Sequence, residues 1–183
     1  RLVIAQVNPR MPRTWGDSFV HVDDIDWFVL HEEPLVEAMT DAVDNQISMR
    51  IGHFVSQIIE DGATLQIGFG YLPNVILRYL DGKKDLGIHT QLVTDGLLPL
   101  LEKGVITNKK KSLLPGRVVA SLCMGTDKLY RYVDNNPMFS FSPTEYVNDP
   151  FVIGQQNKMV AINTALEIDL TGQVCSDSLG TRF

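Results

Sequence analysis

The sequence predicts an α/β fold in which helices flank an open, mostly parallel sheet. Two observations support this prediction. Between residues 47 and 103, apolar residues at helical spacing alternate with short apolar runs typical of buried strands, and only short connections separate them. The 183 residues are 44% hydrophobic and 21% charged, which is ordinary for a globular chain with its own core.

The first part of the sequence holds few elements. Residues 1–7 form an apolar run typical of a strand already in progress, residues 18–22 alternate apolar and polar side chains, and acidic loops follow up to residue 46. This part cannot close a core alone, so we expect it to complete a sheet formed mostly by residues outside this sequence. We interpret Trp15 and Trp27 as core anchors. The lack of an initial methionine and the strand-like ends indicate a fragment of a larger protein.

Helices and strands alternate in the middle of the sequence. Ile51, Val55, Ile58 and Ile59 recur at helical spacing, and residues 60–62 (Glu-Asp-Gly) end that helix. The expected elements are a helix over 47–59, a strand over 63–67, a helix that begins near Pro73, a strand over 86–93 and a helix over 97–103.

The last part is expected to contain two strands, over 117–123 and 159–170. Between them, residues 134–150 are rich in Asn, Pro and Ser, which indicates a loop with a short strand or turn inside it. Thr171 and Gly172 then reverse the chain and predict a hairpin.

Charge and composition exclude several classes of protein. Sixteen Lys and Arg against 22 Asp and Glu give a net charge of −6, which argues against binding to nucleic-acid phosphates. The apolar content is too high for a disordered chain, and no apolar run is long enough to span a bilayer. Cys123 and Cys175 lie outside any spacing typical of metal sites. We therefore expect no metal, no disulfide scaffold and a reducing, cytoplasmic location.

The first candidate site is the segment 66–70, whose sequence is Gln66-Ile67-Gly68-Phe69-Gly70. It lies between an expected strand and an expected helix. Its glycines let the backbone turn sharply and leave N–H groups free to approach a ligand, and the helix adds its positive end, which favours an anion or a developing oxyanion. A lone Gly-x-Gly also fits a plain tight turn between strand and helix, which is its more common meaning.

The second candidate site lies on the expected strand over 86–93. Because side chains alternate along a strand, His89, Gln91 and Val93 should share one side. Gln91 lies near the carboxyl end of this strand, where open α/β sheets bind ligands. His89 could act as an acid or base, but without a partner in the sequence we favour a satisfied, half-buried polar residue.

The third candidate is the end of the expected strand over 159–170, where Asn163, Glu167 and Asp169 should share one face. An amide donor beside carboxylates suits a polar pocket, and it equally suits the wet face of a half-buried strand. Both interpretations stay open. The three lysines at 109–111 are interpreted as a solvated loop rather than a phosphate site.

Four stretches of the sequence together resemble the acetyl-CoA hydrolase/transferase family, most closely its 4-hydroxybutyrate and butyrate CoA-transferase branch. They follow the order of the family across nearly the whole chain. The four stretches are residues 11–22 (MPRTWGDSFVHV), 59–70 (IEDGATLQIGFG), 86–90 (LGIHT) and 162–173 (INTALEIDLTGQ).

The resemblance implies a fold of the CoA-transferase type, with two similar open α/β domains and the active site between them. Residues 1–46 would end the first domain, and residues 47–183 would begin the second domain, incomplete at its C-terminus. Asn163 would help to hold the carbonyl oxygen of a CoA thioester. The residues implied to border the CoA thioester are Gln66, Ile67, Gly68, Phe69, Gly70 and Leu166.

One residue departs from the family pattern. The family has a glutamate nucleophile after His-Thr or His-Ser, and here that position is Gln91. An amide is uncharged and its oxygen is a poor nucleophile, so Gln91 should not start covalent catalysis. Three explanations stay open: an engineered trap, a natural paralogue that binds CoA without turnover, and an error in the recorded residue.

The activity that the resemblance implies is transfer of CoA between an acyl-CoA and a short-chain carboxylate (acetate, butyrate or 4-hydroxybutyrate) through a glutamyl-CoA intermediate. CoA and acyl-CoA would be substrates, with no tightly bound cofactor. The partners would be the missing remainder of the polypeptide and a second copy in a homodimer, with no nucleic acid or membrane. The alternatives are an acyl-CoA hydrolase, an inactive acyl-CoA-binding paralogue, and a protein in which Glu167 is the surviving carboxylate.

Overall fold

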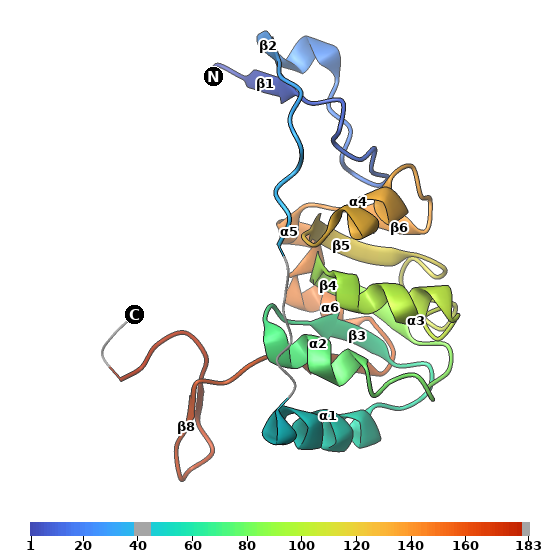
Figure 1. The fold of residues 1–183 in the computed structure, drawn as a ribbon, viewed down its shortest axis with the longest axis vertical. Helices are drawn as coiled ribbons and strands as arrows, with labels where there is room; N and C mark the ends of the chain where they lie inside the picture. The colour runs from blue at the N-terminus through green and yellow to red at the C-terminus, as the bar shows by residue number, and fades with distance from the viewer. Residues whose placement is uncertain (39–44, 181–183) are drawn as a thin grey trace.

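The computed structural model describes residues 1–38 and 45–180. Its centre is a five-stranded sheet in the order β6-β5-β4-β3-β7, in which all neighbouring strands are parallel (Figure 1). The predicted α/β fold with an open, mostly parallel sheet is therefore confirmed. The strands are β3 (Thr64–Ile67), β4 (Gly87–Val93), β5 (Val118–Cys123), β6 (Phe139–Phe141) and β7 (Met159–Ile162).

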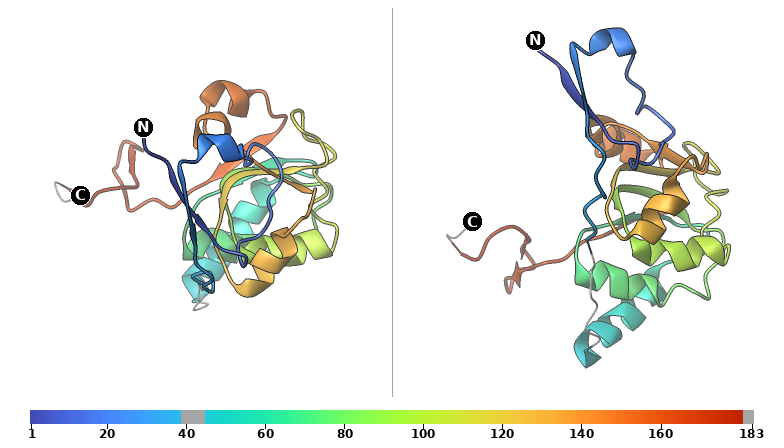
Figure 2. Two further views of the ribbon diagram at one scale, coloured as in Figure 1. Left: turned by 90° about the horizontal axis from the view of Figure 1, so that it is seen from above. Right: turned by 45° about the horizontal axis from the view of Figure 1, so that its top comes forward.

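Helices cover both faces of this sheet. The helices α1 to α4 lie against one face, and α5 and α6 lie against the other (Figures 1 and 2). The three predicted helices correspond to α1, α2 and α3, whereas the last three were not predicted. The last two have only four and five residues, too few for a clear apolar period. The helices are α1 (Gln46–Ile58), α2 (Tyr71–Leu77), α3 (Leu98–Glu102), α4 (Asp127–Val133), α5 (Thr144–Val147) and α6 (Pro150–Gly154), with short 3₁₀ helices at Val22–Asp24 and Asp95–Leu97.

The hydrophobic core packs the sheet against α2 and α3. Leu65 and Ile88 on neighbouring strands are fully buried, and Leu77 and Leu98 from the helices pack in the same cluster. Of the four apolar residues predicted at helical spacing around the first helix, Ile59 is buried and Val55 packs against the core, whereas Ile58 is 74% exposed. The buried residues of α1 are the small ones, Ser48, Gly52 and Ser56.

The first part of the chain forms a separate two-stranded parallel sheet of β1 (Ile4–Val7) and β2 (Trp27–Leu30). The second strand was not predicted, and the alternating residues 18–22 form no strand. The expected core role of the tryptophans is also wrong, because Trp27 is 65% exposed and Trp15 is 37% exposed. Two strands have only one layer, so a side chain on either face stays in contact with water unless another layer packs on it.

A short extended segment ties this first part to the edge of the main sheet. The Phe141 N–H donates to the Trp15 carbonyl, and the Asp17 N–H donates to the Phe141 carbonyl, both at 2.7 Å. Gly16 between them has a φ of +112°, and a Cβ there would lie 2.2 Å from the Phe141 oxygen, so only glycine fits. This attachment places residues 11–18 beside the carboxyl end of β5.

The last part of the chain corrects the prediction of one long strand over 159–170. Strand β7 ends at Ile162, and the chain then forms a hairpin of β8 (Glu167–Ile168) and β9 (Val174–Cys175), as Thr171 and Gly172 predicted. The strand stops because its partner β3 ends at the same level of the register, and no further ladder is available. Asn163 and Glu167 therefore do not share a strand face.

The lysine cluster is the other correction. Lys111 is buried, and its Nζ donates to the carbonyls of Ile88 and Arg117 at 2.7 Å each. Burial disfavours the charged form and lowers the pKa of Lys111 to about 7. Of the three lysines predicted to be solvated, this one is part of the fold.

Candidate active site

The carboxyl ends of β3, β4 and β7 meet around a cavity of about 360 Å³. This is the edge at which open α/β sheets bind ligands. The cavity brings together six of the eight residues that the sequence proposed for the site. It is lined by Gln66, Ile67, Gly68, Phe69, Gln91, Leu92, Leu122, Met124 and Asn163.

Position 91 is the one exposed position of strand β4. Gln91 is exposed, while the other six residues of β4 are buried. The preceding residue fixes its place, because the Thr90 hydroxyl donates to the Ile67 carbonyl at 2.9 Å and accepts from the Ile67 N–H at 3.1 Å. This pair of bonds holds β4 against the glycine turn, so the side chain at position 91 faces the cavity that the turn borders.

The glycine turn is held close to the end of β7. The Gly68 N–H donates to the Ile162 carbonyl at 2.8 Å, so this group is not available to a ligand as the sequence analysis expected. Among the residues that the structure describes, the N–H groups of Phe69 and Gly70 donate no hydrogen bond. These two groups are the donors that the turn can offer to an oxyanion.

Asn163 belongs to the site through a reciprocal amide pair. The Asn163 Nδ2 donates to Gln66 Oε1 at 2.9 Å, and the Gln66 Nε2 donates to Asn163 Oδ1 at 3.2 Å. A Cβ on Gly68 would lie 2.6 Å from Asn163 Oδ1, so the absence of a side chain at 68 lets the amide lie there. Each amide uses one of its two N–H donors in the pair and keeps the other for a ligand.

Two of the proposed residues lie outside the lining of this cavity. Gly70 is the N-cap of α2 with a φ of +123°, which glycine tolerates, and the only donor it can offer is its backbone N–H. Leu166 is 52% exposed, and its N–H donates to the Cys175 carbonyl in the hairpin. The sequence could not separate Leu166 from the others, because its distance from the cavity depends on where β7 ends.

His89 lies on the same strand as Gln91 but is buried and satisfied. Its Nε2 is 2.8 Å from the Val147 carbonyl, and its Nδ1 is 3.3 Å from the Gln156 amide. Burial lowers the pKa of His89, since the charged imidazolium loses its hydration there. The structural interpretation favoured from the sequence agrees with this environment.

Sequence reasoning missed the apolar wall of the cavity. Leu122 and Met124 come from the end of β5 and the residues after it, beside the strand that carries Gln91. The signal was available in part, because 117–123 was predicted as a strand and ligands gather at strand ends. The sequence analysis did not predict the strand order, which places β5 next to β4.

In residues 1–38 and 45–180, no three His, Cys, Asp or Glu side chains are grouped in a way that could hold a metal ion. Within the same ranges, no helix combines the length and apolar character needed to cross a membrane.

Comparison with known proteins defines the class of protein. Residues 125–183 match the family model of the acetyl-CoA hydrolase/transferase C-terminal domain. The whole chain aligns with 42% of the 4-hydroxybutyrate coenzyme A transferase of Clostridium kluyveri at 48% identity. It also aligns over 97% of its length with 40% of the succinyl-CoA:cyclohexane-1-carboxylate CoA transferase of Geobacter metallireducens at 40% identity.

Solved structures have the same fold. A crystal structure of 4-hydroxybutyrate CoA-transferase from Porphyromonas gingivalis matches 94% of this chain, with a TM-score of 0.91 and 42% sequence identity over 44% of that chain. RipA from Yersinia pestis matches 96% of this chain, with a TM-score of 0.90 and 38% identity over 41% of its own length. The chain belongs to the acetyl-CoA hydrolase/transferase family, and it spans about two fifths of the length of the curated relatives it matches.

Proposed function

We propose that the protein containing this chain transfers CoA between an acyl-CoA and a short-chain carboxylate, with position 91 as the site of covalent catalysis. The observation that carries the proposal is the exposure of Gln91 in one cavity with Gly68 and Asn163. The relatives support the substrate class, since their names give CoA transfer involving 4-hydroxybutyrate, butyrate and other carboxylic acids.

With glutamate at position 91, the reaction would proceed in balanced steps. The carboxylate attacks the thioester carbonyl, the C–S bond breaks, and an acyl-glutamyl anhydride and CoA thiolate form. The thiolate attacks the glutamyl carbonyl of the anhydride, which releases the first carboxylate and leaves glutamyl-CoA. The acceptor carboxylate then attacks glutamyl-CoA, which releases CoA thiolate and forms a new acyl-glutamyl anhydride. The thiolate attacks the acyl carbonyl of this anhydride, so the acceptor leaves as the new acyl-CoA and the glutamate is restored.

The other site residues would act on the oxyanions of these steps. Asn163 retains one amide N–H, and Phe69 and Gly70 offer backbone N–H groups beside it. Donors held in place before the reaction stabilise a developing oxyanion without reorganising, and removing one such donor costs roughly 10²–10³ in kcat in a well-studied protease. The side chains proposed to border the thioester are Gln66, Ile67, Gly68, Phe69, Gly70 and Leu166.

The test is to restore the charge at position 91. The full-length protein with Gln91→Glu is expected to exchange CoA between acetyl-CoA and butyrate or 4-hydroxybutyrate, whereas the Gln91 protein is not. Gln57→Glu on the exposed surface of α1 is the matched control, because it adds the same charge away from the cavity. If the folded Gln91→Glu protein shows no exchange, position 91 is not the nucleophile.

A second function is favoured by Gln91 itself: a non-catalytic protein that binds acyl-CoA. This alternative predicts CoA binding by calorimetry and no covalent adduct trapped by borohydride, even with glutamate at position 91.

A hydrolase differs from a transferase only in that water intercepts the intermediate. Omitting the acceptor carboxylate from the Gln91→Glu assay separates the two enzymes, because only the hydrolase then continues to release free CoA. Full turnover after Glu167→Gln in an active parent would exclude the Glu167 alternative.

The remaining parts of the proposal concern the whole protein. Residues 1–46 would end one CoA-transferase domain and residues 47–183 would begin the next, which is supported by the separate β1–β2 sheet. We expect a homodimer, to be checked by light scattering, that uses CoA as a substrate and holds no tight cofactor. A cytoplasmic location is in keeping with the free thiols of Cys123 and Cys175.

A further inference from the structure

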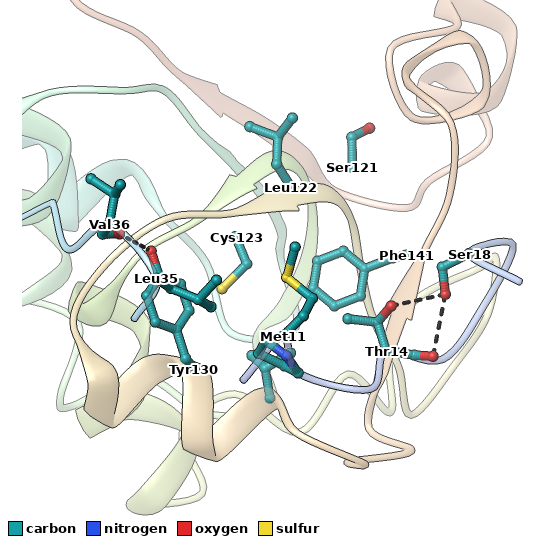
Figure 3. A pocket seen from close by; sticks show the side chains of 12 residues that line it. Met11, Thr14, Ser18, Leu35, Val36, Ser121, Leu122, Cys123, Tyr130 and Phe141 are labelled. Carbon is teal, nitrogen blue, oxygen red and sulfur yellow. Dashed lines mark hydrogen bonds between the residues drawn. The ribbon is translucent and has the colours of Figure 1, made fainter. Parts of the chain in front are cut away.

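A second cavity, of about 410 Å³, lies between the first part of the chain and the edge of the main sheet (Figure 3). Its volume falls in the range of roughly 300–1,000 Å³ that is typical of small-molecule sites. The figure shows the side chains of Met11, Leu35 and Cys123 gathered in the middle of the view. The cavity is lined by Met11, Pro12, Thr14, Ser18, Leu35, Val36, Ser121, Leu122, Cys123, Tyr130, Val133 and Phe141.

The lining carries no charge. It contains no Asp, Glu, Lys, Arg or His, and burial together with nearby Asp95 raises the pKa of Cys123 to about 12, so the thiol is neutral at physiological pH. A charged ligand would lose its hydration in this cavity without gaining a partner. The cavity therefore suits a neutral, mostly apolar group.

Most polar groups of the lining are already satisfied. The Tyr130 hydroxyl donates to the Val36 carbonyl at 2.8 Å, and the Thr14 hydroxyl donates to Ser18 Oγ at 2.9 Å. The exception is Ser121, whose Oγ is buried and has no hydrogen-bond partner among the described residues. This oxygen has almost no accessible surface, so it lies behind the wall, and a ligand in this cavity meets an essentially apolar surface.

This second cavity adjoins the candidate active site. Leu122 lines both cavities. The strand register pairs Thr90 with Ala120 and Leu92 with Leu122, so Gln91 and Ser121 are neighbours on adjacent strands. Adjacent strands are about 4.8 Å apart, and paired residues of parallel strands point to the same face. The unpaired hydroxyl thus lies next to the proposed position of covalent catalysis.

We propose that this second cavity holds the aliphatic chain of the acyl group whose carbonyl is bound at position 91. The proposal rests on the proposed function, because it places the tail of the same substrate. The acyl carbon meets the side chain at 91, and the chain passes Leu122 into an uncharged space built partly by residues 11–18 and 35–36. Chain-length selectivity would then be set by the attachment of the first part of the chain to the sheet.

The test uses the full-length protein with Gln91, because an unreactive amide leaves the acyl-CoA intact. Acetyl-, butyryl- and hexanoyl-CoA are titrated by calorimetry. Moving one methylene out of water strengthens binding about fourfold, so we expect butyryl-CoA to bind roughly 15-fold more tightly than acetyl-CoA. A dissociation constant that does not fall with chain length would overturn the proposal.

Met11→Trp fills the cavity from a residue that is 63% exposed, and Met49→Trp is the matched control on α1, outside both cavities. We expect Met11→Trp to abolish the gain from acetyl- to butyryl-CoA, and an unchanged circular-dichroism spectrum would show that the variant is folded. If acetyl-CoA binding is lost as well, Met11→Phe is measured in its place and must reduce the gain. Met49→Trp should keep the whole gain.

The outcomes distinguish this inference from the proposed function. If Gln91→Glu exchanges CoA but the gain survives in both Met11 variants, the cavity is not the acyl site and the function stands. If no exchange appears while the chain-length gain is present and lost in Met11→Trp, the cavity stands and the function fails. If no acyl-CoA binds at all, both are overturned.

Discussion

Replacing Gly68 by alanine should destabilise the protein and disturb the candidate site at the same time. The added Cβ would lie 2.6 Å from Asn163 Oδ1 and 2.9 Å from the Ile162 carbonyl oxygen, and the latter is backbone and cannot swing away. Inserting one methyl group into such a packed place typically costs about 1–3 kcal/mol. If Asn163 turns aside, the two amide bonds to Gln66 are lost, each worth about 0.5–1.5 kcal/mol net.

We therefore expect Gly68→Ala to lower the free energy of unfolding by about 2 kcal/mol, measured by urea denaturation of the full-length protein. Gly154→Ala in α6 is the matched control, because a Cβ there meets no atom within 4 Å and the φ of Gly154 is not positive. In the background of Asn163→Ser, the cost of Gly68→Ala should fall, since the longer amide no longer meets the methyl group. If Gly68→Ala and Gly154→Ala differ by less than about 0.5 kcal/mol, the close approach of the turn to β7 is refuted.

Three further predictions concern other buried groups. Thr90→Val should lower the free energy of unfolding by about 1–3 kcal/mol, because the Ile67 N–H and carbonyl lose the hydroxyl that satisfies them; urea denaturation measures this, and an unchanged midpoint would contradict it. The pKa of Lys111 is about 7 in the fold and 10.5 in the reference state, so the unfolded chain binds more protons between these two values. The free energy of unfolding should therefore rise as the pH increases from about 7 towards 10.5. Comparing unfolding at pH 7 and pH 9 tests this, and Lys111→Met should remove the rise. Cys123, with its pKa raised to about 12, should resist iodoacetamide at pH 8 in the native protein and react after denaturation, as mass spectrometry of the peptide would show.

The fold could be predicted from local patterns where elements are long enough to show a period. The strand of residues 87–93 and the helix of residues 46–58 were both predicted within one residue at each end. The short helices α5 and α6 were missed, and residues 163–166 were wrongly added to β7. Strand ends depend on whether a neighbouring strand is present, and local sequence carries no record of the neighbour.

In the candidate site, too, local features could be predicted from the sequence and contacts between distant segments could not. Gly68 and Gln91 were proposed from residue type and position along single elements, and the structure places both at one cavity. Lys111 was misjudged because three lysines in a row look solvated, although the third reaches two backbone carbonyls inside the fold. Leu122 was missed because its role depends on the order of the strands.

The sequence by itself determined the alternation of helices and strands, the glycines of the turn and the amide at position 91, because periodicity and residue chemistry are local properties. Only the tertiary structure decided that Gln66 pairs with Asn163, 97 residues away, and that Ser121 lies unpaired beside position 91. The first contact follows from β7 lying beside β3, out of chain order, and the second follows from the register between β4 and β5. Such an order is selected by packing of the whole core, which no single segment encodes.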